Sequence, residues 1–241
     1  MIKERLWEID LARGLAIIKM VIFNYSFALF YLGIYTFKEG LSFQGWAAAV
    51  FIFLAGLSLT ISYSRIKDRK PREIFKKFFL RGVRVFGYGI LITVITFILF
   101  PNVFIIFGVL HFIGVSIIIG QFFLKYRKLN LFLGLSIIIL GFYLQNFTFD
   151  FPWLLWLGFV PKNFSTFDYF PILPWFGITL LGIFSGNILY KNGKRSFKIK
   201  DLSNNVITKF LGFLGRNSLA IYLIHQPLLI VLLLALGFKV F

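Results

Sequence analysis

The stretch Trp7-Glu-Ile-Asp-Leu-Ala-Arg-Gly-Leu-Ala-Ile-Ile-Lys-Met-Val-Ile-Phe-Asn-Tyr25 carries polar residues into a run that is otherwise apolar enough to cross a membrane. At about 100° per residue, Asp10, Arg13 and Asn24 fall within roughly 60° of one another on a helical wheel. Polar groups that face lipid are costly, so they usually turn toward a bundle interior or a cavity. We therefore expect this helix to form one wall of a site.

The composition indicates an all-α integral membrane protein. Of the 241 residues 59% are hydrophobic and only 15% are charged, and apolar runs extend along the whole chain. Taking about 20 apolar residues per span, we predict helices near residues 11–35, 43–64, 80–100, 103–124, 129–147, 171–190 and 218–238. No repeat or linker divides the chain, so we expect about seven transmembrane helices in a single polytopic domain, residues 1–241.

The net charge of +17 is a topology signal. With the N-terminus on the cytoplasmic side, 22 Lys and Arg residues fall inside, in the runs 1–13, 65–84, 125–128 and 191–216. The other side holds Lys38, Lys162 and Lys239, and Lys19 lies within the first span. The positive-inside rule then predicts a multi-pass protein of the plasma membrane with its C-terminus outside, and no nucleic-acid partner.

The chain has no cysteine, which excludes disulfides, thiolate nucleophiles and Cys-ligated metals. Two histidines and nine carboxylates make a dedicated metal site improbable, so we expect no metal.

Three polar residues are predicted near mid-membrane depth. His225 lies roughly 13 Å along a helix from Arg216, and Asn24 roughly 16 Å from Arg13. His111 lies roughly 12 Å below the opposite edge. A neutral imidazole at this depth suits a general base for acyl transfer. A structural role, with each His bonding a carbonyl or hydroxyl across helices, is the alternative.

Basic residues 65–84 lead into the third predicted span, with Arg81 and Arg84 nearest the bilayer. They suit the phosphates of a cytoplasmic donor such as a coenzyme A thioester. Anchoring on anionic lipid is the alternative. Asp10 and Arg13, at spacing i, i+3, either pair with each other or let Arg13 reach a phosphate while Asp10 holds it.

The outer loop 148–170 contains Asp168 and several aromatic residues, and Trp175 follows it. Such residues suit an acceptor pocket, because flat aromatic faces stack on sugar rings. An interfacial aromatic belt is the alternative. Further along, Gly182-Ile-Phe-Ser-Gly186 is either a site of close helix approach or a chance match in a glycine-rich chain.

Five motifs run in order along the chain. They are Arg5-Leu-Trp-Glu-Ile-Asp-Leu-Ala-Arg-Gly-Leu-Ala-Ile-Ile-Lys-Met20, Phe53-Leu-Ala-Gly-Leu-Ser-Leu59 with Ser62-Tyr-Ser-Arg65, Gly108-Val-Leu-His-Phe-Ile-Gly114, Pro171-Ile-Leu-Pro-Trp-Phe-Gly177 and Gly215-Arg-Asn-Ser-Leu-Ala-Ile-Tyr-Leu-Ile-His-Gln-Pro227. Together they resemble the heparan-alpha-glucosaminide N-acetyltransferase-like family of polytopic membrane acyltransferases. The residues that match its polar motif positions are Asp10, Arg13, Asn24, His111 and His225.

The resemblance implies an enzyme that transfers acetyl from cytoplasmic acetyl-CoA, its co-substrate, across the membrane to a sugar amine or hydroxyl on a glycan or lipid-linked acceptor. The glucosaminide enzymes have a catalytic histidine soon after the position of Asn24, whereas residues 26–45 here contain none. His225 or His111 would then serve as base. The chain is also shorter than the eukaryotic enzymes, so the partners we expect are membrane lipids, an acyl donor, the acceptor and a second copy in a homo-oligomer.

Two other functions fit the same residues. Polar groups at mid-membrane depth equally suit a transporter or flippase for a polar or lipid-linked solute. The missing histidine also suits an inactive family member that acts as an assembly subunit.

Overall fold

The computed structural model describes residues 6–31, 33, 41–235 and 237, and every named element in them is a helix, as predicted. These residues belong to two compact units, which are described separately. One unit combines Met1–Phe51 with Ile199–Phe241, and the other is Ile52–Lys198. The division between them falls inside one helix, α2 (Leu41–Ser64).

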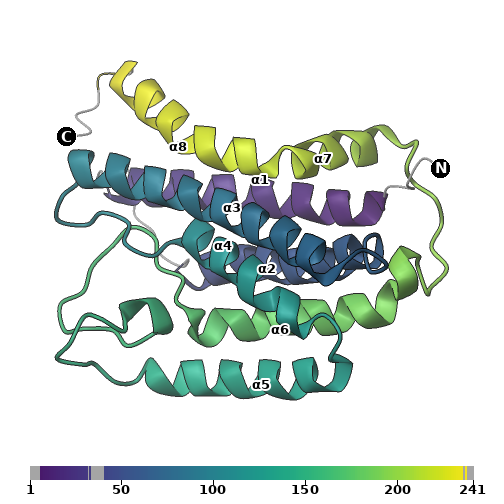
Figure 1. Cartoon of the computed structure of the whole chain (residues 1–241). Helices are drawn as coiled ribbons and strands as arrows, with labels where there is room; N and C mark the ends of the chain where they lie inside the picture. Colours follow the sequence, from purple (N-terminus) through teal and green to yellow (C-terminus); the bar gives the residue numbers. More distant parts are fainter. Residues whose placement is uncertain (1–5, 32, 34–40, 236, 238–241) are drawn as a thin grey trace. The chain divides into compact units, whose positions relative to one another are not determined.

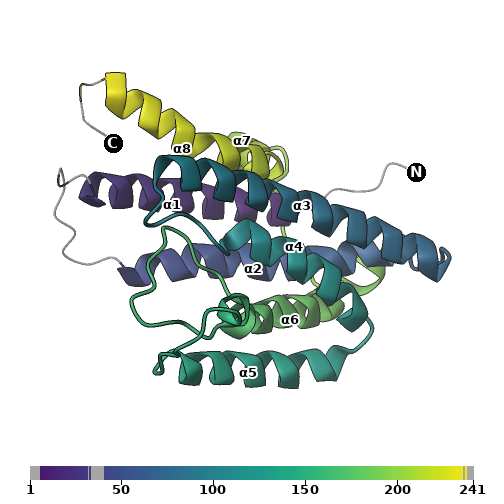
Figure 2. The same cartoon turned by 60° about the vertical axis from the view of Figure 1, so that its left-hand side comes forward.

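In the first unit, α1 (Trp7–Tyr31) lies beside α7 (Val206–Arg216) and α8 (Ser218–Ala235), as Figures 1 and 2 show. Two glycines let the backbones of α1 and α7 meet. A Cβ atom on Gly14 would collide with the Leu211 carbonyl, and one on Gly215 with the Asp10 carbonyl. Small residues therefore set the close approach of these two helices.

Helix α7 differs from the prediction, which treated residues 191–216 as a cytoplasmic loop. Asn205 caps the helix, because its side-chain oxygen accepts hydrogen bonds from Ile207 N and Thr208 N, 2.8 and 3.4 Å away. One face of α7 is apolar and exposed, with Val206, Ile207, Phe210 and Phe213. A helix of 11 residues is too short to cross a membrane, so a search for long apolar runs misses it.

The second unit contains the remainder of α2 and four more α-helices. These are α3 (Pro71–Leu99), α4 (Val109–Gly120), α5 (Arg127–Leu144) and α6 (Ile172–Leu189), with short 3₁₀ turns at Gln121–Phe123, Leu155–Leu157 and Lys191–Gly193. Helix α4 packs on α3, and α5 runs along α6 (Figure 1). Pro71 suits the first turn of α3, so this helix begins nine residues before the predicted span.

The fourth predicted span, 103–124, is only partly helical, because α4 has 12 residues. The segment before α4 is held instead by the outer loop. Phe167 N donates to Val103 O at 3.1 Å, and Phe170 N donates to Phe107 O at 2.9 Å. These bonds satisfy the carbonyls of Val103 and Phe107 without a helix, and the hydroxyl of Thr166 does the same for the carbonyl of Phe104.

Five helical segments among the described residues are long and apolar enough to span a membrane, against seven predicted. They are Trp7–Phe30, Ala47–Ser64, Pro71–Leu99, Arg127–Leu144 and Ile172–Leu189. Helices α7 and α8, bent by 77°, would together form a sixth. The predicted ends of the first and last spans, with Lys38 and Lys239, lie outside the described residues.

The glycine pair in α6 lies at a close contact with α2. A Cβ atom on Gly182 would collide with the Phe53 carbonyl, and one on Gly186 with the Thr60 hydroxyl. The interpretation of this motif as a site of close helix approach is therefore confirmed.

Replacing Gly182 with Ala should destabilise the protein. Overpacking costs about 1–3 kcal/mol, which exceeds the gain of about 1 kcal/mol that Ala brings to a helix interior. We expect a lower midpoint of thermal unfolding in detergent. Gly87→Ala is the control, because a Cβ at this exposed position of α3 meets nothing within 4 Å and should leave the midpoint unchanged or raised. Equal shifts in the two variants would contradict the packing argument.

Candidate functional site

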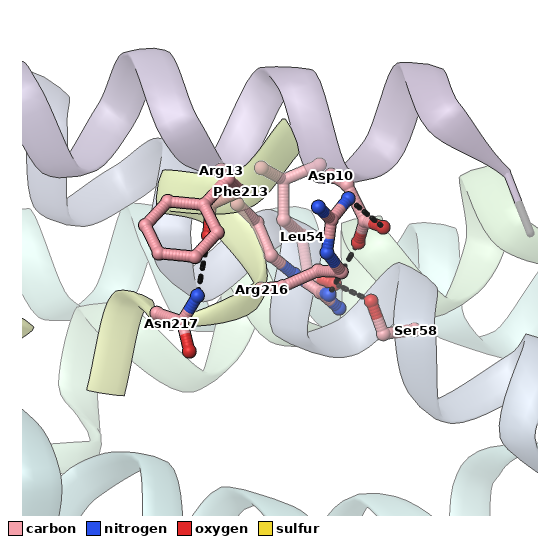
Figure 3. Close-up of polar contacts among 7 residues, drawn as sticks. All are labelled: Asp10, Arg13, Leu54, Ser58, Phe213, Arg216 and Asn217. Carbon is pink, nitrogen blue, oxygen red and sulfur yellow. Dashed lines mark hydrogen bonds and ion pairs between the residues drawn. The ribbon is translucent and has the colours of Figure 1, made fainter. Parts of the chain in front are cut away.

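The cytoplasmic end predicted for α1 carries an ion-pair cluster, shown in Figure 3. Arg13 Nη1 lies 3.5 Å from Asp10 Oδ1, and Arg216 Nη1 lies 3.9 Å from Asp10 Oδ2. The Asp10 side chain is only 15% exposed. Arg216 reaches it because Gly215 packs directly on the Asp10 carbonyl. Two guanidinium groups from two helices therefore share one largely buried carboxylate.

A cavity of about 210 Å³ opens beside this cluster. Its lining residues are Trp7, Asp10, Ser203, Thr208, Lys209, Gly212 and Arg216. The indole Nε1 of Trp7 is buried and has no hydrogen-bond partner among the described residues. The lining residues carry two cations, two hydroxyls and this indole N–H against one carboxylate, so the cavity is lined mostly by hydrogen-bond donors, which suits an anionic ligand.

Further along α1, a second polar cluster joins α1 to α8. Asn24 Nδ2 lies 3.1 Å from His225 Nε2, and the Tyr25 hydroxyl donates to the His225 carbonyl at 3.1 Å. His225 Nδ1 lies 2.7 Å from the Tyr222 carbonyl. The His225 residue is 5% exposed. The structure thus brings together Asn24 and His225, which the sequence placed at similar depths.

The second histidine lies in the other unit and is enclosed. His111 is 2% exposed, with Phe86 edge-on at 5.1 Å and Phe107 stacked at 5.7 Å between ring centroids. Its Nδ1 accepts from Gly108 N at 3.2 Å, and its Nε2 lies 3.3 Å from the Thr93 hydroxyl. Both ring nitrogens are therefore engaged within α3, α4 and the turn before α4.

Asp168 lies at the same end of α4 as His111. Its Oδ2 accepts from Val109 N at 2.9 Å, so the carboxylate satisfies an amide of the first turn and complements the helix dipole. The next residue, Tyr169, donates its hydroxyl to the Leu155 carbonyl at 2.7 Å, and burial raises the pKa of this phenol. Hydrogen bonds from two consecutive residues of the outer loop therefore fix its position, one to the start of α4 and one to the 3₁₀ turn Leu155–Leu157.

Replacing Asp168 with Ala should loosen the start of α4. Loss of a helix-capping acceptor costs about 1 kcal/mol. We expect faster hydrogen exchange at Val109 and a lower unfolding midpoint, whereas Asp168→Asn, which keeps an oxygen acceptor, should fall between this variant and the wild type. Unchanged exchange at Val109 in the Ala variant would show that the cap contributes nothing.

The other predicted binding residues are placed as follows. Arg81 and Arg84 are exposed on α3, in the second unit, whereas Asp10 and Arg13 are in the first. Trp175 is half-buried in α6, with its ring centroid 4.6 Å from that of Phe170. No group of three His, Cys, Asp or Glu side chains that could hold a metal ion occurs in the part of the chain that the structure describes.

Sequence reasoning missed Arg216, Lys209 and Tyr25. Arg216 stands in the Gly215-Arg-Asn-Ser218 motif, but a basic residue just before an apolar run is typical of a membrane edge and does not by itself indicate a site. A carboxylate with one cation three residues away gave no signal of a second cation from a distant helix. Tyr25 is next to Asn24, and an aromatic residue in a span is too common to stand out.

A family model for the catalytic region of heparan-alpha-glucosaminide N-acetyltransferase matches residues 5–227. The match includes both clusters on α1, together with Arg216 and His225. Comparisons with curated proteins and with solved structures gave no significant match. Since the family model spans most of the sequence, the chain belongs to the heparan-alpha-glucosaminide N-acetyltransferase catalytic family of membrane acetyltransferases.

Proposed function

We propose that this protein transfers acetyl from cytoplasmic acetyl-CoA to a sugar amine or hydroxyl, on a glycan or lipid-linked acceptor, across the plasma membrane. The observation that carries the proposal is the pair of clusters on α1. Asp10 and Asn24 are fourteen residues apart in one helix, which corresponds to about 21 Å. That separation suits an elongated donor with phosphates at one end and a thioester at the other.

The donor's phosphates would bind at the Asp10 cluster. Arg13 and Arg216 present guanidinium groups, which favour phosphate, and Lys209 adds a third cation at the cavity. Asp10 would hold both arginines in place. Arg81 and Arg84, exposed on α3, would add to the attraction for the same anionic donor.

The topology that we propose places this end in the cytoplasm and the C-terminus outside. It is supported by the 22 to 3 distribution of Lys and Arg. The five candidate spans, the short apolar helix Val109–Phe123 and the bent pair α7 and α8 would together make seven crossings of a single polytopic domain. We also propose that copies of this chain associate as a homo-oligomer in the bilayer.

At the second cluster on α1, beside Asn24, His225 would act as the general base. Its Nε2 would take the proton of the acceptor amine or hydroxyl as the acceptor oxygen or nitrogen attacks the thioester carbonyl. The C–S bond then breaks, and the coenzyme A sulfur leaves with the proton from the imidazolium. Asn24, 3.1 Å from Nε2, would hydrogen-bond a reacting group. His111 is the less suitable base, because the nitrogen that carries its lone pair accepts from the backbone amide of Gly108, whereas Nε2 of His225 meets the side-chain amide of Asn24.

On the outer side, Trp175 and Asp168 are proposed to contribute to the acceptor site. The support is that Asp168 fixes the outer loop on α4 and that Trp175 keeps part of its ring surface exposed. A flat ring there would stack on a sugar.

The test is to incubate the purified protein, in lipid bilayers, with labelled acetyl-CoA and a panel of amino sugars and sugar alcohols. We expect donor binding and label transfer to at least one acceptor. Absence of both binding and transfer would reject the enzymatic proposal. His225→Ala should keep donor binding and lose transfer, which separates the two steps.

A second function, transport or flipping of a polar or lipid-linked solute, is favoured by one observation. Helices α7 and α8 are bent by 77° at a short break, and broken helices are typical of transporter binding sites. Solute flux into proteoliposomes without consumption of acetyl-CoA would support this function. Flux that requires acetyl-CoA turnover, or no flux, would favour the acyltransferase.

A further inference from the structure

The hydrogen bonds of His111 determine which of its ring nitrogens carries the proton. Nδ1 accepts from the Gly108 amide at 3.2 Å, so in the neutral ring it is unprotonated. The proton is then on Nε2, which donates to the Thr93 hydroxyl at 3.3 Å. The Thr93 hydroxyl in turn donates its hydrogen bond to the Ile105 carbonyl at 2.6 Å. His111 is thus a neutral ring protonated on Nε2, with no lone pair left for a substrate.

His225 has the opposite arrangement. Its Nδ1 lies 2.7 Å from the Tyr222 carbonyl, which can only accept, so Nδ1 carries the proton. In the neutral ring the lone pair is then on Nε2. The Asn24 amide, 3.1 Å away, must present its NH₂ group to this nitrogen. His225 therefore points a basic nitrogen at a neutral hydrogen-bond donor, as a base points at a reacting amine or hydroxyl.

Tyr25 fixes this arrangement between the two helices. Asn24 and Tyr25 are consecutive in α1, and they hold the ring and the backbone of the same residue in α8. The Tyr25 hydroxyl donates to the His225 carbonyl at 3.1 Å, and its ring stacks on the imidazole at 6.3 Å between centroids and 15° between planes. The bond to Tyr222 is local to α8, so it cannot orient the ring toward α1.

We infer that Tyr25 is a positioning residue that turns the Nε2 lone pair of His225 toward Asn24 of α1, the Tyr222 carbonyl holding this ring as the Nδ1–H tautomer, while His111 is held as the Nε2–H tautomer. The tautomers themselves follow from the hydrogen bonds alone. The conclusion that His225 is the base rests, in addition, on the proposed acyl transfer.

The experiment uses the full chain in lipid bilayers, labelled with ¹⁵N at its two histidines. Solid-state NMR separates protonated from unprotonated ring nitrogens. At about pH 8.5, roughly two units above the ordinary imidazole pKa of about 6.5, both rings should be neutral. We expect one histidine in each tautomer. Thr93→Val removes a partner of His111 only and so should assign its signals.

Tyr25→Phe removes one hydroxyl and tests the positioning role. We expect the Nε2 signal of His225 to shift, because the ring loses its fixed position against Asn24, while the Nδ1–H signal held by Tyr222 and the His111 signals stay unchanged and report an intact fold. Tyr143→Phe, which removes an exposed hydroxyl on α5, is the control and should change neither histidine. Two histidines in the same tautomer, or a Tyr25→Phe spectrum identical to the wild type, would overturn the inference.

Two further measurements keep the outcome decisive. If Tyr25→Phe does not fold, Asn24→Ala replaces it: His225 should keep the Nδ1–H tautomer, and a switch to Nε2–H would overturn the inference. In the transfer assay, Tyr25→Phe should lower kcat and leave the KM for the donor unchanged. Opposite tautomers without any transfer in the wild type would reject the proposed function alone. Transfer with the tautomers reversed would reject the inference alone.

Discussion

His225→Ala is expected to reduce the rate of acetyl transfer by about 10²- to 10⁴-fold, the usual contribution of a positioned general base. The variant removes the Nε2 lone pair that faces Asn24, but leaves the Asp10 cluster, where the donor's phosphates are proposed to bind. The KM for acetyl-CoA should therefore change little while kcat falls. Initial rates with labelled acetyl-CoA, at several donor concentrations, measure both constants.

His111→Ala is the matched comparison for this prediction. It leaves the Gly108 amide and the Thr93 hydroxyl without their imidazole partner inside a buried site. We expect a lower unfolding midpoint, because buried groups left unsatisfied are costly, with transfer retained at temperatures where the variant is folded. Full activity in His225→Ala would exclude His225 as the base. Loss of activity in folded His111→Ala alone would move that role to His111.

Asp10→Ala is expected to have the largest effect on stability. The change removes the one carboxylate that Arg13 and Arg216 share, in a cluster where the Asp10 side chain is 15% exposed. Removing one partner of a fully buried ion pair costs about 3–5 kcal/mol. The loss here should be smaller than that but well above that of an exposed pair, because the Arg13 and Arg216 side chains are 25% and 39% exposed. Thermal unfolding in detergent should show a marked drop of the midpoint, and the KM for the donor should rise.

Asp150→Ala is the control for this prediction. Asp150 lies 2.9 Å from Lys162, but these side chains are 83% and 65% exposed. Exposed ion pairs contribute about 1 kcal/mol or less. The midpoint of thermal unfolding of Asp150→Ala should differ little from that of the wild type, and high salt should abolish the difference between them. If Asp10→Ala and Asp150→Ala lose equal stability, the ion pairs of Asp10 contribute no more than an exposed pair, contrary to what their burial indicates.

The sequence predicted the features that depend on periodicity and composition. The polar face of α1 and the helical fold follow from the order of apolar and polar residues in single segments, whereas the family was predicted from the resemblance of five motifs. The pairing of Asp10 with Arg13 was one of two readings, and local spacing alone kept both open. The 3.5 Å contact in the structure shows the pair.

Features that depend on contacts between distant segments were not predictable. Arg216 reaches Asp10 through a glycine contact, and no pattern within residues 205–217 reveals that neighbour. The late start of α4 depends on hydrogen bonds from residues 167 and 170, more than fifty residues further along the chain. Helix α7 is amphipathic and short, so neither a span search nor the density of basic residues around it indicates a helix.

The glycine contacts between α1 and α7 also bear on how this protein can evolve. A single added methyl group at Gly14 or Gly215 would meet a backbone carbonyl and push apart the helices that bring Arg216 to Asp10. Neither glycine has a side chain to offer a substrate. In a saturation-mutagenesis map scored by growth or activity, both positions should nevertheless appear as intolerant as reacting residues. Selection for activity would then conserve Gly14 and Gly215, although neither residue takes part in the reaction.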